Sequence, residues 1–285
     1  MLRARLATAA IAIPLLLLLI FAAPPWVFAA VVGVLALLGV LEFVSMAFPG
    51  NFRERAVGTV LGAGVIAGAL WGPSACGVQV LQSTRWCGGP EVAWLGGLAV
   101  VLMLGLSWTV VGRADFERGF NDLGLTLVGV LYVGFLLPHF VWLRQTEQGP
   151  AWVTFILATS MLGDTGGYFV GHAIGRHKLA PRISPGKTIE GSVGILLGTV
   201  AASLAAKVIL SYFVTWFVTW REALWLGVIL AGLSQLGDLA ESVMKRTFGV
   251  KESGWMFPGH GGVLDRIDSL LFPVGFVYYY IVFVR

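Results

Sequence analysis

The chain has 285 residues, of which 57% are hydrophobic and only 12% are charged. A typical soluble domain carries about 25% charged residues, so this composition excludes a water-soluble enzyme. The net charge of +4 is too small to indicate a nucleic-acid partner. A lipid bilayer is the solvent that accommodates so much apolar surface, which indicates an all-α polytopic membrane protein.

Apolar runs of about 20 residues can cross the hydrocarbon core of a bilayer as helices. We expect nine transmembrane helices, at 7–23, 26–47, 56–71, 92–111, 123–142, 151–171, 191–214, 223–244 and 267–284. The third run is short, and Pro24 and Pro25 join the first two closely, so a re-entrant or merged element is the alternative at either place. The first run also resembles a secretory signal peptide. An uncleaved span is favoured, because removing it would spoil the charge pattern described next.

The positions of the 19 Lys and Arg residues predict the orientation of these spans. With the N-terminus in the cytoplasm, the outer segments receive only Arg85, Arg144, Arg221 and Arg285, while Lys207 lies inside a span. Such a bias follows the positive-inside rule. We therefore predict a multi-pass protein of a bacterial inner membrane, with its C-terminus outside and its active site towards the cytoplasm.

The loops and spans also predict how the chain is organised. Cys76 and Cys87 would share the outer loop between the third and fourth spans, where a disulfide and two unpaired thiols are equally compatible with the sequence. The two longest inner loops are 172–190 and 245–266. We divide the chain into N-terminal membrane helices, 1–150, and a catalytic membrane region, 151–285, that contains both loops.

Asp164 is an acidic residue in an otherwise apolar run. A charge at the bilayer centre costs about 2.5–3.5 kcal/mol on insertion scales, so Asp164 is expected to face a polar cavity. The alternative is a structural aspartate bonded to a neighbouring hydroxyl such as that of Thr165. Gly163, Gly167 and Gly171 recur every four residues beside it, which predicts close packing against another helix.

The segment from Ser184 to Gly191 is a candidate anion site, although it lacks the spacing of a P-loop. The hydroxyls of Ser184 and Thr188, the Lys187 ammonium and a helix that begins near Thr188 would all favour a phosphate. Glu190 is a further pocket candidate. A plain capped helix start with an inner lysine is the alternative interpretation.

Two pairs of acidic residues follow. Asp238 and Glu241 are three residues apart at the end of the eighth span, and Asp265 and Asp268 have the same spacing at the start of the ninth. Residues three apart share a helix face, so both pairs are expected to face one pocket. Clustered carboxylates fit Mg²⁺, and two such ions could clamp a phosphoryl displacement. A salt-bridged loop and a proton relay in an ion-coupled transporter are the alternatives.

Basic residues of the same stretch would neutralise a polyphosphate. They are Lys245, Arg246, Lys251 and Arg266. His260 lies among glycines in this stretch, where a loop histidine and a proton donor to pyrophosphate remain equally open.

This stretch resembles the signature of the CDP-diacylglycerol synthases, also called phosphatidate cytidylyltransferases. The matching positions are Ser242, Lys245, Arg246, Lys251, Pro258 to Gly262, Asp265, Arg266 and Asp268. Glu252 departs from the aspartate usual in the family. The resemblance extends over roughly 155–270, and it includes Asp164 to Gly171 and Ser184 to Gly191.

The resemblance implies a helical membrane fold, a homodimer, and Asp238 and Asp265 as ligands of Mg²⁺, with Asp268 and Glu241 as further ligands. A second cation, of the same or a different kind, is also expected. The substrates would be phosphatidic acid from the lipid bilayer and CTP from water. Lys187, Lys245, Arg246 and Arg266 would bind phosphates. A CTP-dependent lipid kinase of the polyprenol type, which transfers the γ-phosphate, is the closest rival.

Overall fold

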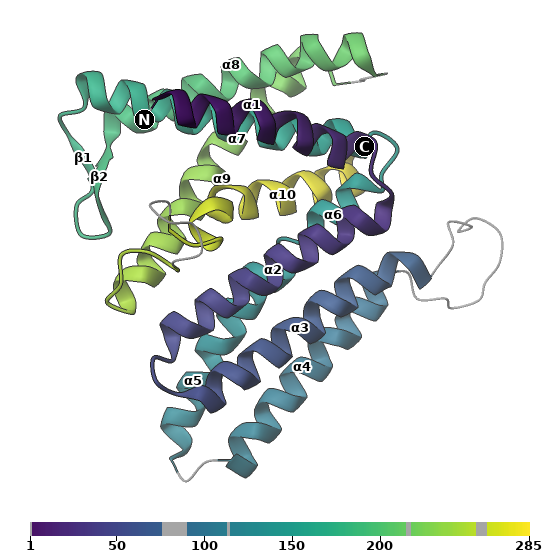
Figure 1. Ribbon diagram of the computed structural model, residues 1–285, viewed down its shortest axis with the longest axis vertical. Helices are drawn as coiled ribbons and strands as arrows, with labels where there is room; N and C mark the ends of the chain where they lie inside the picture. The colour runs from purple at the N-terminus through teal and green to yellow at the C-terminus, as the bar shows by residue number, and fades with distance from the viewer. Residues whose placement is uncertain (1, 76–89, 113–114, 215–217, 255–260) are drawn as a thin grey trace. The chain divides into compact units, whose positions relative to one another are not determined.

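The computed structural model describes residues 2–75, 90–112, 115–214, 218–254 and 261–285, and the chain is almost entirely helical (Figure 1). The predictions for Cys76, Cys87 and His260 lie outside the described residues. In chain order the elements are α1 (Leu2–Phe21), α2 (Pro25–Ala47), α3 (Phe52–Ala75), α4 (Pro90–Gly112), α5 (Phe116–Gly129), the π-helix η1 (Val130–Phe135), α6 (His139–Arg144), α7 (Gly149–Ile174), β1 (Lys178–Ala180), β2 (Ser184–Thr188), α8 (Ile189–Phe213), α9 (Trp220–Thr247) and α10 (Leu264–Val284).

Each predicted span coincides with helical structure in the described residues. The fifth, 123–142, is interrupted, because it comprises α5, η1 and α6. Pro138 lies directly before α6, and a proline disfavours helical geometry in the residue that precedes it. Within the ranges that the structure describes, five segments are long and apolar enough to cross a membrane: α2, the run Phe116–Arg144, α8, α9 and α10. The number of spans and the sides of the two termini stay predictions.

The loop 172–190, which the sequence predicts to lie on the inner side, contains the one pair of strands among the described residues, and the sequence did not predict these strands. Strands β1 and β2 form an antiparallel hairpin in which Lys178 pairs with Thr188 and Ala180 with Ser184. Helix α8 begins directly after β2, and the Thr188 hydroxyl accepts the Gly191 N–H at 3.0 Å. Thr188 is therefore an N-cap, as expected for a helix that begins there.

The chain divides into two compact units that interleave in the sequence. The first unit comprises 1–31, 140–243 and 268–285, and the second unit comprises 32–139 and 244–267. Both α9 and α10 contribute residues to each unit. The division near residue 150 that the sequence predicts concerns function and stays a prediction.

Helices α7 and α8 of the first unit pack at backbone distance, as the glycine spacing predicts. A Cβ added at Gly166 would lie against the carbonyl oxygen of Gly194, and one at Gly167 would meet the Ile195 side chain. Gly163 likewise faces the Thr199 hydroxyl. Because these glycines have no side chain, α7 and α8 approach each other closely. The short side chains beside the glycines on the two helices can then form one continuous wall.

The second unit has its core along α2, where Val40, Phe43 and Val44 are fully buried. Gly129 faces the Phe43 ring and Gly62 faces Val40, so small residues of neighbouring helices receive the large ones of α2. Helices α3 and α4 of the same unit lie side by side (Figure 1). This packing fixes the position of α2, which carries the carboxylate of Glu42.

Candidate functional site

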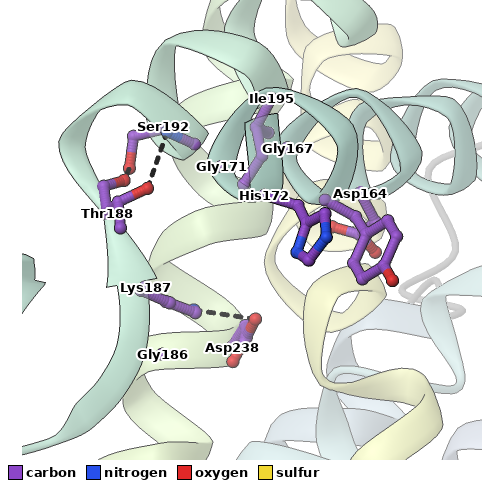
Figure 2. A pocket seen from close by; sticks show the side chains of 12 residues that line it. Asp164, Gly167, Gly171, His172, Gly186, Lys187, Thr188, Ser192, Ile195 and Asp238 are labelled. Atoms are coloured by element: carbon purple, nitrogen blue, oxygen red, sulfur yellow. Dashed lines mark hydrogen bonds and ion pairs between the residues drawn. The ribbon is translucent and has the colours of Figure 1, made fainter. Parts of the chain in front are cut away.

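A pocket of about 460 Å³ opens in the first unit between α7, β2, α8 and α9 (Figure 2). Its volume lies in the range of about 300–1,000 Å³ that is usual for small-molecule sites. The side chains and glycines that line it are Asp164, Gly167, Tyr168, Gly171, His172, Gly186, Lys187, Thr188, Gly191, Ser192, Ile195 and Asp238. Four of the candidate residues predicted from sequence therefore line one cavity: Asp164, Lys187, Thr188 and Asp238.

Helix α7 supplies one wall of the pocket with three side chains. Asp164, Tyr168 and His172 follow one another at intervals of four residues, which places them on one helix face. The adjacent face carries Gly167 and Gly171, and it packs on α8 near Ile195 and Gly191. The close helix packing therefore directs the Asp164 carboxylate and both rings into the cavity. The Ser269 hydroxyl lies 3.5 Å from that carboxylate.

Lys187 faces this wall from strand β2. Its ammonium lies 2.7 Å from the carboxylate of Asp238 on α9 (Figure 2). The ammonium nitrogen is buried, and within the described part of the chain no other acceptor completes its hydrogen bonds. A cation in this state retains N–H groups for an anion that enters the pocket.

Two other candidates of the anion segment stabilise the hairpin instead. Ser184 pairs with Ala180 at the start of β2. Glu190 accepts hydrogen bonds from the backbone N–H groups of Arg176 and His177 and lies 2.6 Å from the His177 ring. Neither Ser184 nor Glu190 is among the residues that line the pocket. These contacts of Ser184 and Glu190 stabilise the hairpin that carries Lys187.

The two acidic pairs do not present all four carboxylates to the pocket. Asp238 lines it, but Glu241, one turn further along α9, is fully buried. Asp268 is also buried, and it accepts the N–H of Ser269 at 2.7 Å. Residues three apart point about 60° apart around a helix, which suffices to separate a pocket wall from the helix interface.

Asp265 belongs to the second unit and is surrounded there by donors. The Lys245 ammonium lies 2.5 Å from one carboxylate oxygen. The other oxygen accepts the N–H of Ser253 at 2.9 Å, the Ser253 hydroxyl at 2.8 Å and the Gly262 N–H at 2.8 Å. This network holds Ser253 and Gly262 against the start of α10 and fixes the position of Lys245.

Glu42 is the residue of this network that the sequence analysis missed. Its carboxylate accepts the N–H groups of Val263 and Leu264 at 2.9 Å each, and the Ser253 hydroxyl at 3.1 Å. The first N–H groups of a helix have no partner within the helix, so Glu42 caps α10 from another element. The available signal was a single carboxylate in the otherwise apolar α2.

The remaining basic candidates lie at the surface of the second unit. Arg246 donates to the carbonyl oxygen of Val250 at 3.1 Å, and Arg266 is exposed. Lys251 is exposed as well. Their positions allow contact with an anion from solvent, but the phosphate-binding role of each stays a prediction.

The carboxylates of Asp164 and Asp238 give the pocket the hard oxygen ligands that Mg²⁺ prefers. Across the described ranges, no group of three His, Cys, Asp or Glu side chains could enclose a metal ion. Mg²⁺ usually binds through one or two carboxylates and completes its coordination with water and substrate phosphates. The pocket therefore fits a magnesium ion that arrives with a polyphosphate.

Comparison with known proteins reveals similarity along almost the whole chain. A family model described as the cytidylyltransferase family matches residues 3–284. The phosphatidate cytidylyltransferase of Staphylococcus saprophyticus is 37% identical over 209 residues, which cover 70% of this chain and 74% of the relative. That of Staphylococcus aureus (strain COL) is 36% identical over 200 residues, with the same two coverages. That of Bacillus subtilis is 36% identical over 184 residues, covering 64% of this chain and 65% of the relative.

Proposed function

Because the chain belongs to the cytidylyltransferase family, we propose that it is a phosphatidate cytidylyltransferase, an enzyme that transfers CMP from CTP to phosphatidic acid. The products are CDP-diacylglycerol and pyrophosphate. The observation that carries the proposal is the buried Lys187 ammonium, which lies 2.7 Å from the Asp238 carboxylate in a pocket that Asp164 also lines and that is large enough for a nucleotide. Relatives named for this activity support the same reaction.

The reaction needs no nucleophile from the protein. A phosphate oxygen of phosphatidic acid attacks the α-phosphorus of CTP, and a new oxygen–phosphorus bond forms as the bond to the β-phosphate oxygen breaks. The electron pair leaves with pyrophosphate. Since the attacking phosphate is already anionic at neutral pH, catalysis consists of positioning the two substrates and neutralising their charge.

In the first unit, Lys187 is the residue that binds a substrate phosphate. Its ammonium exchanges part of its interaction with Asp238 for a phosphate oxygen of CTP. Asp164 and Asp238 would hold Mg²⁺, which lowers the repulsion between phosphates and stabilises the leaving pyrophosphate. Thr188 contributes indirectly, because its cap fixes the start of α8 next to Lys187.

In the second unit, Lys245 is held by Asp265 and offers a further positive charge; Arg246 follows Lys245 and Arg266 follows Asp265 in the sequence, and both arginines are exposed. We assign these three residues to substrate phosphates. Asp265 is assigned a positioning role through Lys245 and Ser253, in addition to the metal-binding role that the family resemblance implies. A second cation and a homodimer remain part of the proposal on the same resemblance.

The proposed location is a bacterial inner membrane, with the site open to the cytoplasm. The excess of Lys and Arg in the segments assigned to the inner side supports this orientation. CTP would enter from water, and the acyl chains of phosphatidic acid would stay in the bilayer.

A product assay with position-labelled CTP tests the proposal. Purified protein in mixed micelles of detergent and phosphatidic acid receives CTP labelled at the α- or the γ-phosphate, with Mg²⁺ or with EDTA. We expect α-label in the lipid phase and pyrophosphate in the water phase, only when Mg²⁺ is present. Lipid labelled from the γ-phosphate would identify a lipid kinase instead, and folded protein without either product would favour a transporter.

A further inference from the structure

One end of the pocket is aromatic. The rings of Tyr168 and His172 stack with centroids 5.9 Å apart and planes only 5° from parallel. Both residues line the cavity, and both follow Asp164 on the same face of α7. The proposed reaction step uses neither ring, so this pair has no role yet.

The Tyr168 side chain lines the cavity and is largely exposed. It is 67% exposed, although it packs edge to face against Phe169 with centroids 5.6 Å apart. Phe169 is equally exposed, at 65%, but it does not line the pocket. A tyrosine that only fills the protein core would be covered on both faces, so the exposed Tyr168 ring is available to a ligand.

The other end of the pocket is charged. Lys187 and Asp238 form their ion pair there, while Asp164 lies beside His172 on the α7 wall (Figure 2), and the Lys187 ammonium retains hydrogen-bonding capacity for an anion. One cavity therefore combines a phosphate-binding end with a flat aromatic surface. A nucleotide combines the same two chemistries, because its triphosphate is anionic and its base has a π face that stacks on aromatic side chains.

We infer that the Tyr168–His172 pair is the base-binding subsite of the pocket, and that the pyrimidine ring of CTP extends this two-ring stack. The inference rests on the proposed function for the identity of the nucleotide. It assigns Tyr168 to the nucleoside end of CTP, while Lys187 remains with the phosphates. Because every base has a π face, stacking alone would supply affinity rather than the choice between cytosine and uracil.

A different role is open to an exposed tyrosine in a membrane protein, since such rings often lie at the level of the lipid headgroups. That role would make Tyr168 a contact of phosphatidic acid or of the surrounding bilayer. The two roles predict different kinetic effects, because one concerns the nucleotide and the other concerns the lipid.

The experiment compares Tyr168→Leu, Tyr168→Phe and the matched control Phe169→Leu in the purified full-length chain. Michaelis constants are measured separately for CTP and for phosphatidic acid in mixed micelles, together with inhibition by inorganic triphosphate. We expect Tyr168→Leu to raise KM for CTP about ten-fold or more, as loss of one base–aromatic stack would. Tyr168→Phe and Phe169→Leu should stay within about two-fold of wild type, because both retain the Tyr168 ring or its equivalent.

The inhibition constant for triphosphate, which has no base, should not change in Tyr168→Leu. If it rises as much as KM for CTP, Tyr168 acts on the phosphate end and the inference is wrong. A rise in KM for phosphatidic acid alone would place Tyr168 at the lipid and overturn it as well. An equal effect of Phe169→Leu, in which the Tyr168 ring remains, would show that the loss of affinity is not specific to the ring that lines the pocket, which also contradicts a base-binding subsite.

Equilibrium dialysis with labelled CTP separates this inference from the proposed function. If wild-type protein binds CTP and Tyr168→Leu does not, the base subsite stands even where no CDP-diacylglycerol forms. If CDP-diacylglycerol forms and dialysis finds equal CTP affinity in both proteins, the reaction stands and the base subsite falls.

Discussion

The carboxylate of Glu42 accepts the backbone N–H of Leu264 at 2.9 Å, although the two residues are 222 positions apart in the chain. Val263 donates to the same carboxylate, so α2 supplies the cap for α10 within the second unit. Capping by a distant residue, rather than by the residue before the helix, makes the start of α10 depend on the packing of α2. The loop that carries Ser253 depends on it too, through the Ser253 hydroxyl.

Glu42→Ala should therefore destabilise the protein. The N–H groups of Val263 and of Leu264, the first residue of α10, would lose a charged acceptor, and we expect a loss of about 2 kcal/mol in the free energy of unfolding. Thermal melting of the detergent-solubilised protein measures the change, with Glu117→Ala on the exposed start of α5 as the control. A Glu42→Ala variant as stable as the control would show that water replaces the cap.

Lys187→Met should reduce turnover of CTP while the protein stays folded. The substitution retains most of the side-chain volume but removes the ammonium that lies beside Asp238. We expect kcat/KM for CTP to fall about 10- to 100-fold, which is the value of one or two hydrogen bonds to a charged group. Lys178→Met on the exposed strand β1 is the matched control and should retain wild-type kinetics. Unchanged kinetics in Lys187→Met would remove this residue from the phosphate site.

Gly166→Ala should separate α7 from α8. Its methyl group would lie against the carbonyl oxygen of Gly194, and backbone atoms cannot move aside as a flexible side chain can. Overpacking of this kind costs about 1–3 kcal/mol. Gly232→Ala is the control in the same unit, since no atom lies within 4 Å of a Cβ added there. The control should be neutral or stabilising by about 0.5–1 kcal/mol, because alanine favours helix. Equal melting temperatures for the two variants would contradict the close helix contact.

Asp238→Asn should raise the concentration of Mg²⁺ that half-maximal activity requires. An amide is a weaker ligand for a hard cation than a carboxylate, and we expect the requirement to rise about ten-fold or more. The measurement is a titration of activity with Mg²⁺ after treatment with EDTA, and Asp164→Asn should behave alike. Asp115→Asn is the control, because asparagine can replace aspartate as the N-cap of α5. A Mg²⁺ requirement that neither pocket variant alters would assign the cation to other residues.

Much of the fold could be predicted from the sequence, because long apolar runs identify helices and glycines at every fourth position identify a close helix contact. The π-helix and the break before α6 could not, since a proline within an apolar run does not by itself indicate a break: Pro14 and Pro273 lie inside α1 and α10. The hairpin was missed for a different reason. Its strands are short and lack alternating hydrophobic residues, so no periodic pattern marks them.

The candidate site was predicted only in part. Helical spacing placed Asp238 and Glu241 on one face, but the difference between a pocket wall and a buried interface depends on which helix packs there. Asp265 was expected to be a metal ligand alone, whereas its contacts with Lys245 and Ser253 give it a structural role. An Asp265→Asn variant is therefore expected to lose stability as well as activity. The NH₂ group of the asparagine amide is a donor, and it would face groups that themselves donate hydrogen bonds.

The hairpin also has a consequence for how the pocket can change over evolution. Lys187 and Thr188 are the last residues of β2, and Thr188 pairs with Lys178 on β1. Neighbouring side chains of a strand point to opposite faces, so shifting the strand by one residue would turn Lys187 away from Asp238. Residues 181–183 do not line the pocket, yet a single insertion or deletion in this turn would then remove the positive charge of the pocket without replacing any lining residue.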